Sequence, residues 1–397
     1  MRRRKILIAL LAFSLAIAVA AEVLLRVLDP AGGESVPPVR ELLDRQAEAH
    51  DPVYVPHADF GALLAPFQEV EVDTPDFRYT FRTDHAGFPN REPWPEHIDV
   101  AVLGNSLITG AGVGYEGQFT TLLQQELGGR TVLNFGLPGG GAEHQLRTYR
   151  ALAAPLQPRL VIATLWLTWE IDNSLKFAAW LREEPRPDFT EYRHAYNATH
   201  AEADKPKPSA GSRARNSLRE LVNRSRVLRA INERVRSLRG IRQPVERVEL
   251  ENGEVLYLSA RDEMRLMSGW DRPGTPDMRE IFFAPLKTLQ AEVEAAGGTF
   301  MVVLFPCKEE LYAANEFPEL LKPVAEARIE LRTRDIPTLD LYPDFQATAA
   351  SQPMFHPIDM HLNAAGHRLV ADALARSIAQ RGVFTPAPTQ PDRLNGP

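Results

Sequence analysis

Three short segments of the chain carry residue types that together could catalyse acyl chemistry. Ser106 follows the apolar run 98–103, the segment 134–141 (Asn-Phe-Gly-Leu-Pro-Gly-Gly-Gly) is rich in glycine, and Asp359 precedes His361 by two residues. A serine at a strand end is exposed and can act as a nucleophile. Glycines leave backbone N–H groups open to an oxyanion, and a carboxylate can orient a histidine that takes the serine proton. The combination indicates nucleophilic acyl chemistry.

Each segment alone also has a structural interpretation. A serine between a strand and a helix is commonly a helix cap, the glycines could form only a tight turn, and no G-x-S-x-G motif surrounds Ser106. His356, Asp359, His361 and His367 could instead suggest a metal site, but they lack the i, i+4 helical spacing of typical zinc enzymes. We therefore predict neither a metal site nor a cofactor.

These segments can meet only if the elements that carry them form one sheet. Apolar runs predict strands at 98–103, 131–135, 160–167, 300–305 and 338–341. Helical spacing of apolar residues predicts helices at 119–127, 146–154, 281–296, 320–332 and 364–380. This alternation predicts an α/β fold, a three-layer sandwich around a parallel sheet with right-handed crossovers. Sites in such folds lie at the carboxyl ends of the strands, where Ser106 falls.

Composition and pattern divide the chain into six segments. We expect an N-terminal signal anchor at 1–29, and then a linker and irregular lead-in at 30–97 with one alternating strand-like stretch at 77–81. The first part of the α/β domain follows at 98–175, an Arg-rich helical insertion at 176–275, the second part of the domain at 276–382, and a Pro-rich tail at 383–397.

The N-terminus predicts export of the rest of the chain. Four basic residues at 2–5 precede an apolar run at 6–21, which resumes after Glu22 at 23–25. A basic flank followed by ~20 mostly apolar residues is typical of a single membrane-spanning helix whose positive end stays in the cytoplasm. A cleaved signal peptide is the alternative, because the segment 18–20 (Ala-Val-Ala) fits a small-x-small cleavage site. Both interpretations export the body of the protein, to the periplasm or the cell surface.

The insertion has a composition of its own. Positions 196–212 are polar and contain proline, so we expect a flexible loop there. Positions 213–242 hold ten arginines and two acids, with apolar residues on one helical stripe. An amphipathic helix with a solvated basic face explains this pattern. A basic lid that meets anionic lipid headgroups or an acidic polymer is the alternative.

Charge and cysteine content exclude several classes of protein. The chain of 397 residues is 44% hydrophobic and 24% charged, which are ordinary values for a globular protein. Its 45 basic and 52 acidic residues give a net charge of −7, and we therefore predict no nucleic-acid partner, because phosphate neutralisation needs clustered Lys and Arg. The single cysteine, Cys307, allows neither an internal disulfide nor a Cys-based zinc or iron–sulfur site.

Taken together, the segments 102–110, 134–141 and 359–367 resemble the SGNH hydrolases, also called the GDSL esterase and acyltransferase superfamily. Their order along the chain fits that family, and the resemblance covers roughly 77–175 and 280–382. The Arg-rich anchor and the lead-in at 81–88 are similar to membrane-anchored bacterial members. Pro306, Lys308 and Tyr312 look like the Pro-x-Lys-x-x-x-Tyr segment of relatives tied to exopolysaccharide O-acetylation. The resemblance implies an SGNH or flavodoxin-like sandwich.

The resemblance also implies roles for individual residues. Ser106 would be the nucleophile, His361 the general base, and Asp359 the residue that orients His361. The backbone N–H groups of Ser106 and Gly139 would form part of the oxyanion hole, in which a fixed donor is worth ~3–4 kcal/mol.

Lys308 and Tyr312 are candidate contacts to a substrate carboxylate or sugar hydroxyl. The alternative for this pair is a surface cation beside a packed aromatic ring.

Three positions depart from the family pattern. Asn105 stands where the family usually has Asp, and the acid–base pair is Asp-x-His rather than the commoner Asp-x-x-His, a spacing also found in the polysaccharide-acetylating relatives. Trp169 occupies the position of an Asn whose side chain donates to the oxyanion. An indole N–H is a donor but does not replace that amide directly, and loss of one donor can cost ~10²–10³ in rate. Trp169, with Trp166 and Trp180, could line a sugar-binding platform, and core packing is at least as good an explanation for Trp166.

Two functions from different classes are consistent with these residues. The first is serine-dependent hydrolysis or transfer of a small acyl group such as acetyl, on an acylated envelope glycan or lipid. A transferase would need a donor, delivered across the membrane by an integral-membrane acyltransferase as partner. The second is a non-catalytic glycan-binding or assembly subunit that keeps the fold. Trp169 favours the second, and the retained Ser106, Asp359 and His361 favour the first.

Overall fold

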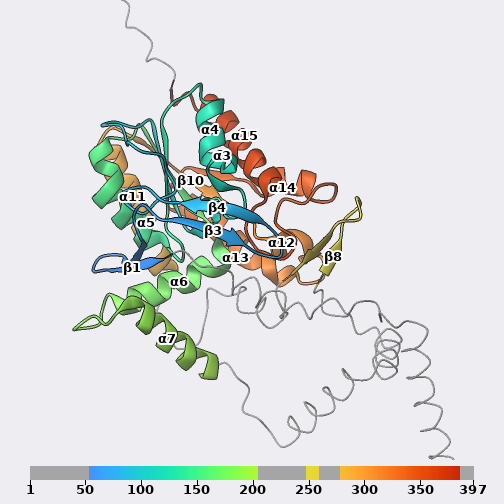
Figure 1. Ribbon diagram of the computed structural model, residues 1–397, viewed down its shortest axis with the longest axis horizontal. Coiled ribbons are helices and arrows are strands. Elements are labelled where there is room, and N and C mark those ends of the chain that lie inside the picture. Colours follow the sequence, from blue (N-terminus) through green and yellow to red (C-terminus); the bar gives the residue numbers. More distant parts are fainter. Residues whose placement is uncertain (1–52, 204–246, 259–277, 385–397) are drawn as a thin grey trace, which may run out of the picture. The chain divides into compact units, whose positions relative to one another are not determined.

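The computed structural model describes residues 53–203, 247–258 and 278–384 (Figure 1). Their centre is a five-stranded parallel sheet in the order β11-β10-β7-β5-β6. The strands are β5 (Val100–Gly104), β6 (Val132–Gly136), β7 (Leu160–Leu165), β10 (Thr299–Leu304) and β11 (Thr338–Asp340). Helices cover both faces, so the predicted α/β sandwich is confirmed.

The central strands are buried on both faces, which explains why they are continuous apolar runs in the sequence. Along β5, Ala101 and Leu103 join one hydrophobic layer, and Val100 and Val102 join the other. The first layer is completed by α5 (Ala142–Thr148), α6 (Leu167–Trp180), α11 (Met278–Ala295) and α13 (Lys322–Thr333). The second is completed by α4 (Phe119–Glu126), α14 (Tyr342–Ala349) and α15 (Ala364–Gln380).

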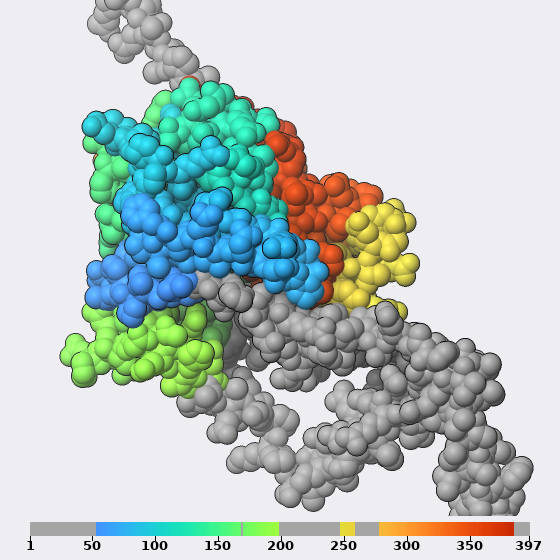
Figure 2. Space-filling view, in the orientation of Figure 1, coloured from blue at the N-terminus to red at the C-terminus, as the bar shows by residue number. Residues whose placement is uncertain are grey.

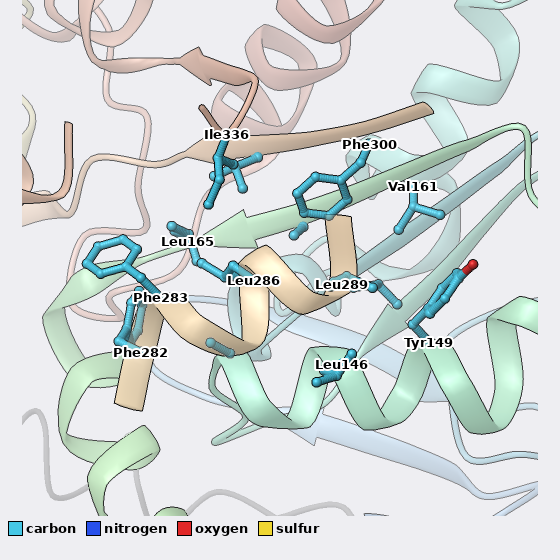
Figure 3. Packing of buried hydrophobic residues seen from close by; sticks show 14 of the residues in the cluster. Leu146, Tyr149, Val161, Leu165, Phe282, Phe283, Leu286, Leu289, Phe300 and Ile336 are labelled. Carbon is cyan, nitrogen blue, oxygen red and sulfur yellow. The ribbon is translucent and has the colours of Figure 1, made fainter. Parts of the chain in front are cut away.

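Helix α11 illustrates the packing of the first layer. In Figure 3, Leu286 and Leu289 of this helix lie next to Phe300 and Val161 of the sheet, and Phe282 belongs to the same layer. All five side chains are at most 2% exposed. Burial of an aliphatic or aromatic side chain contributes ~1.5–3 kcal/mol, and these contacts join the C-terminal part of the chain to strands from its N-terminal part.

The structure contains the five strands and five helices that the sequence predicts, with ends shifted by a few residues. The largest shift concerns the helix predicted at 146–154. It begins earlier, as α5, and continues as a π-helical segment Tyr149–Ala153 and a 3₁₀ turn Ala154–Leu156. The other short elements are the 3₁₀ turns η1 (Ser106–Ile108) and η4 (Pro318–Leu321) and the helices α3 (Gly114–Gly117) and α12 (Lys308–Tyr312).

The lead-in contains two antiparallel hairpins. Strand β1 (Tyr54–His57) pairs with β2 (Gly61–Leu64), and β3 (Glu69–Asp73) pairs with β4 (Arg78–Arg82). The predicted alternating stretch at 77–81 corresponds to β4, which confirms that it is a strand.

After β4, the buried carboxylate of Asp84 accepts hydrogen bonds from the backbone of Ala86 and Phe88 and from the side chains of Asn90 and Trp94. Asn90 in turn exchanges two hydrogen bonds with the backbone of Asn134 in β6. The lead-in is therefore joined to the sheet beside the glycine-rich segment.

The insertion contributes α7 (Phe189–Ala203) and an antiparallel pair, β8 (Arg247–Glu249) and β9 (Val255–Tyr257). The loop predicted at 196–212 is wrong for 196–203, which are helical. This stretch contains Ala and Glu, which favour helix, and no proline interrupts it before Pro206. The predicted basic helix at 213–242 lies outside the described residues.

The predicted anchor at 1–29 and most of the tail at 383–397 also lie outside the described residues. Among the residues that are described, no helix is long and apolar enough to cross a membrane. The six predicted segment boundaries remain predictions.

Candidate active site

Ser106 lies at the carboxyl end of β5 and begins the short 3₁₀ turn η1. Asn105 precedes it, and its side-chain oxygen accepts the N–H of Leu107 at 2.9 Å. This bond caps the turn and fixes the direction in which the chain leaves the strand. Asn134 of β6 adds a second restraint, because its side-chain amide donates to the carbonyl of Ile108 at 2.6 Å. Ser106 itself is half-buried.

The structure brings Ser106, His361 and Asp359 together in one chain of hydrogen bonds. Nε2 of His361 lies 2.9 Å from Oγ of Ser106, and Nδ1 lies 2.6 Å from Oδ1 of Asp359. An ionised carboxylate can only accept, so Nδ1 carries the ring proton and Nε2 faces the serine as an acceptor. The backbone N–H of His361 donates to the same Oδ1 at 2.7 Å. This is the geometry that a serine nucleophile needs from its base.

The electrostatics of the pair favour an ionised Asp359. Burial opposes ionisation of this carboxyl, but the charge of His361 and the hydrogen bonds from its ring and backbone hold the pKa of Asp359 well below its usual range. The side chains of His361 and Asp359 are 17% and 16% exposed. A carboxylate that is mostly shielded from water stabilises a neighbouring imidazolium more strongly than it would in water.

Gly139 lies in the loop between β6 and α5, the loop that the sequence indicated as an oxyanion site. Leu137 donates its N–H to the carbonyl of Gly104 at 2.9 Å, which holds this loop against the end of β5. Gly139 has φ +75°, a conformation that residues with a Cβ rarely adopt. Within the residues that the structure describes, neither the N–H of Ser106 nor that of Gly139 donates a hydrogen bond. Both donors are therefore available to an oxyanion.

Glu170 of α6 holds backbone and side-chain groups next to the site, a role that was not predicted from the sequence. Its fully buried carboxyl accepts the backbone N–H of Trp166 at 2.7 Å and the side-chain amide of Gln145 at 3.0 Å. The amide of Asn105 lies 3.5 Å from the same carboxyl. Burial raises the pKa of Glu170 to about 8. The one signal in the sequence is an acidic residue within a few positions of the end of an apolar strand. An acid that is buried there must have partners.

Trp166 and Trp180, two of the three tryptophans considered for a sugar platform, are buried in the interior. Trp166 and Trp180 are each 3% exposed, and the indole N–H of Trp180 donates to the carbonyl of Pro187. The ring centre of Trp166 lies 5.7 Å from that of His361, so it packs beside the base. Trp169 occupies the first turn of α6, directly after the end of β7, and its side chain lies outside what the structure describes.

The structure places Lys308 differently from the expectation of substrate contact. This lysine is 1% exposed, and its ammonium lies 2.7–3.3 Å from four backbone carbonyls, those of residues 356–359. An ammonium has three protons to donate, so these carbonyls use all of them and the substrate contact predicted for Lys308 is wrong. The hydroxyl of Tyr312 is also buried, and burial raises the pKa of this phenol to about 12. Tyr312 packs in the second hydrophobic layer.

One group in the described part of the chain brings three potential metal ligands together, Asp84, His85 and Glu92. The two oxygens of Asp84 already accept four N–H groups of the lead-in. His85 accordingly pairs with Glu92, at 2.6 Å. These hydrogen bonds hold the lead-in after β4.

A small pocket of about 80 Å³ adjoins Gly139. Apolar residues including Phe60, Leu137 and Phe189 line it, together with Arg193. A Cβ on Gly139 would lie 3.3 Å from the guanidinium of Arg193. The glycine therefore also leaves room for this side chain.

Fold and site together define an α/β protein in which a Ser, a His and an Asp are joined by hydrogen bonds. Residues 279–394, which include Asp359 and His361, match the family described as SGNH hydrolase-like domain, acetyltransferase AlgX. This match confirms the resemblance to the SGNH hydrolases that the sequence analysis drew. No curated protein matches the chain.

Solved structures with a similar arrangement include the lipase/acylhydrolase from Enterococcus faecalis, with 11% identity over 72% of this chain and 96% of that chain and a TM-score of 0.35. The psychrotrophic esterase EstA from Pseudoalteromonas sp. has 12% identity, covers 71% of this chain and 97% of its own, and has a TM-score of 0.35. A catalytic mutant of Axe2, an acetylxylan esterase from Geobacillus stearothermophilus, has 12% identity, coverages of 72% and 95%, and a TM-score of 0.36.

Proposed function

We propose that the protein is a serine-dependent acyl-ester hydrolase or O-acyltransferase. The observation that carries this proposal is the hydrogen-bonded chain from Ser106 through His361 to Asp359, with distances of 2.9 and 2.6 Å. The family match over residues 279–394 supports the same reaction class.

The geometry supports the following sequence of steps. Oγ of Ser106 attacks the acyl carbonyl carbon while Nε2 of His361 takes the hydroxyl proton. The carbonyl oxygen becomes an oxyanion, for which the N–H groups of Ser106 and Gly139 are available donors. The intermediate then collapses: the ester C–O bond breaks, His361 returns the proton to the leaving alcohol, and the acyl group stays on Ser106. Water or a sugar hydroxyl then attacks this acyl-enzyme while His361 takes its proton. The bond from the acyl carbon to Oγ of Ser106 breaks, and His361 returns the proton to Oγ.

For the substrate we propose an envelope glycan or lipid that carries a small acyl group such as acetyl. The acetyltransferase description of the matching family supports an acetyl group. The basic and apolar N-terminus supports a body exported on a membrane anchor, to the periplasm or the cell surface. A transferase in this place would take its donor from an integral-membrane acyltransferase.

The first experiment compares the full-length protein in detergent with its Ser106→Ala and His361→Ala variants. Each sample is treated with a fluorophosphonate probe, and turnover of p-nitrophenyl acetate is followed in parallel. Ser351→Ala is the matched control, because Ser351 is an exposed serine on a surface turn. Labelling and turnover that disappear in both site variants and persist in the control would support a serine acyl enzyme.

No labelling of a folded wild-type protein would refute this function and favour the non-catalytic glycan-binding subunit. Hydrolysis and transfer are separated by adding an oligosaccharide acceptor to the same reaction. Acetylated acceptor that forms at the expense of free acetate would establish transfer.

A further inference from the structure

The carboxylate of Asp359 lies on a loop without regular structure. Residues 356–361 are closed at their base by a single bridge between Phe355 and Leu362 and by the hydrogen bond from the N–H of His356 to the carbonyl of His361, at 3.1 Å. A short irregular loop does not hold a carboxylate within 2.6 Å of a ring nitrogen by itself. Contacts from elsewhere in the fold must supply the missing restraint.

Lys308 supplies the first of these contacts. It is the first residue of α12, which begins after a three-residue connection from β10. Its ammonium lies 2.7 Å from the carbonyl of His356, 2.8 Å from that of Pro357, 3.3 Å from that of Ile358 and 3.1 Å from that of Asp359. One buried cation therefore draws four consecutive carbonyls to the same side of the loop.

Asp76 supplies the second contact, from the turn between β3 and β4. Oδ2 of Asp76 accepts the N–H of Ile358 at 2.7 Å and the N–H of Asp359 at 2.5 Å. Figure 2 shows the surface of this hairpin, in blue, against the orange-red surface of the C-terminal residues. Asp76 thus accepts the N–H groups of Ile358 and Asp359, and Lys308 donates to the carbonyls of the same two residues.

A third contact comes from β9, where the N–H of Tyr257 donates to the carbonyl of Pro357 at 2.7 Å. Segments that are far apart in the sequence therefore converge on one loop. Asp76 and Lys308 bond different backbone groups of this loop and also attract each other through their charges.

We propose that Asp76 and Lys308 are positioning residues that hold the 356–361 loop, and with it the carboxylate of Asp359, in the geometry required for His361 to act on Ser106. This inference rests on the proposed function. Neither residue touches the reacting atoms, and each acts through the backbone of the loop.

The charges of this clamp make its action depend on pH. Burial lowers the pKa of Lys308 to about 8, against the attraction of Glu309, Asp76 and Asp359, which face it. Burial also raises the pKa of Asp76, against its two backbone hydrogen bonds and the charges of Lys308 and His356. As the pH rises past 8, Lys308 loses its proton and its hydrogen bonds to the carbonyls weaken. We therefore expect the acylation rate to fall above pH 8, because Lys308 is deprotonated there.

The test uses full-length Asp76→Ala, Asp76→Asn and Lys308→Met proteins. Asn keeps an oxygen that can accept both N–H groups, whereas Ala removes the acceptor, and Met keeps the length of Lys without its donors. Asp73→Ala, on the same hairpin, and Lys322→Met are matched controls, because these side chains are 67% and 53% exposed. For each protein, kcat and KM on p-nitrophenyl acetate and the rate of fluorophosphonate labelling are measured between pH 6 and 9.5, with hydrogen exchange of the peptide that covers 355–362.

We expect kcat to fall ~10- to 100-fold in Asp76→Ala with little change in KM, because a displacement of about 1 Å at the reacting groups costs up to ~10² in rate. Asp76→Asn should recover most of this loss. Lys308→Met should be slow at every pH and lack the fall above pH 8. Both Asp76→Ala and Lys308→Met should exchange faster in 355–362 than the controls.

Unchanged kcat together with unchanged exchange in Asp76→Ala and Lys308→Met would overturn the proposal, and so would a loss in Asp76→Asn as large as in Asp76→Ala. The exchange measurement does not depend on catalysis. If the wild type shows no labelling at Ser106, the proposed function fails, while the exchange of 355–362 still decides whether Asp76 and Lys308 order the loop. If labelling is normal and exchange is unaffected, only the positioning role fails.

Discussion

Replacing Asp359 by Asn separates two effects of this carboxylate on His361. Oδ1 of Asp359 accepts both the ring Nδ1–H and the backbone N–H of His361, at 2.6 and 2.7 Å. The backbone N–H can only donate, so an asparagine must keep its amide oxygen at this position. The ring then keeps its proton on Nδ1, and Nε2 remains able to accept the proton of Ser106. The variant loses a charge and keeps the tautomer.

The size of the effect follows from the charge. When His361 takes the proton of Ser106 it becomes an imidazolium beside an ionised Asp359. Two unit charges about 4 Å apart attract by about 4 kcal/mol at an effective dielectric constant of ~20, which corresponds to ~10³ in rate. Serine proteases in which the equivalent change reverses the tautomer lose ~10⁴. We expect kcat/KM to fall ~10³ in Asp359→Asn, and at least ~10-fold further in Asp359→Ala, which also loses the orientation of the ring.

The assay is the pre-steady-state burst of p-nitrophenol from p-nitrophenyl acetate, with the rate of fluorophosphonate labelling as a second measure of acylation. Asp344→Asn is the control, because Asp344 lies on the surface helix α14 and pairs with Arg376. Thermal unfolding confirms that each variant is folded. Equal losses in Asp359→Asn and Asp359→Ala would show that the amide has turned and the tautomer is lost. A loss below tenfold in Asp359→Asn would show that the charge does not stabilise the transition state. Either result refutes the reasoning.

Three further predictions concern groups around the site. Gly139→Ala places a Cβ on a residue at φ +75°, which costs ~1–2 kcal/mol of stability; the displaced N–H should lower kcat on p-nitrophenyl acetate ~10² or more, and an unchanged kcat would contradict the oxyanion role. Asp84→Ala leaves four N–H donors without their acceptor, so the unfolding free energy in urea should fall by ~3 kcal/mol or more, and an unchanged midpoint would contradict this. Burial raises the pKa of Glu310 to about 7 from 4.5, so its contribution to stability is full below pH 4.5 and is lost as the pH rises through 7. Glu310→Gln should therefore gain on the order of 2 to 3 kcal/mol over wild type between pH 5 and 8 in urea unfolding, and a constant difference would show that Glu310 is already ionised at pH 5.

The central sheet could be predicted from the sequence because each of its strands carries its own signal. A strand buried on both faces is a continuous apolar run, and such runs at 98–103, 131–135, 160–167 and 300–305 correspond to β5, β6, β7 and β10. The elements that failed lack such a signal. The mixed residues at 196–203 suit a loop or a solvated helix, and the Ala and Glu residues and the absence of proline before Pro206 favour the helix.

The candidate site was predictable to the same extent. Ser106 could be located because a parallel sheet brings the carboxyl ends of its strands to one edge, and Asp359 and His361 because their types and spacing suit a base and its partner. The environment of Lys308 could not be predicted. A lysine after an apolar strand has the same sequence pattern on a surface as in a core. The four carbonyls that accept hydrogen bonds from its buried ammonium belong to residues 356–359. Asp76, in an ordinary turn between two strands, gives no signal of a partner so distant in the chain.

Residues of the lead-in hold the candidate site in place, although the irregular sequence of this segment gives no sign of such a role. Asp84 and Asn90 hold it to Asn134 of β6, whose own side chain reaches the turn that begins at Ser106. Asp76, in the same lead-in, holds the backbone of Asp359. The lead-in, with its hairpins and the irregular stretch after β4, therefore restrains both the nucleophile side and the acid side of the candidate site, although neither Asp76 nor Asn90 belongs to the α/β sheet. The α/β domain alone would keep its strands and lose the restraints that bring its functional groups into register, and so the functional unit includes the hairpins that precede β5.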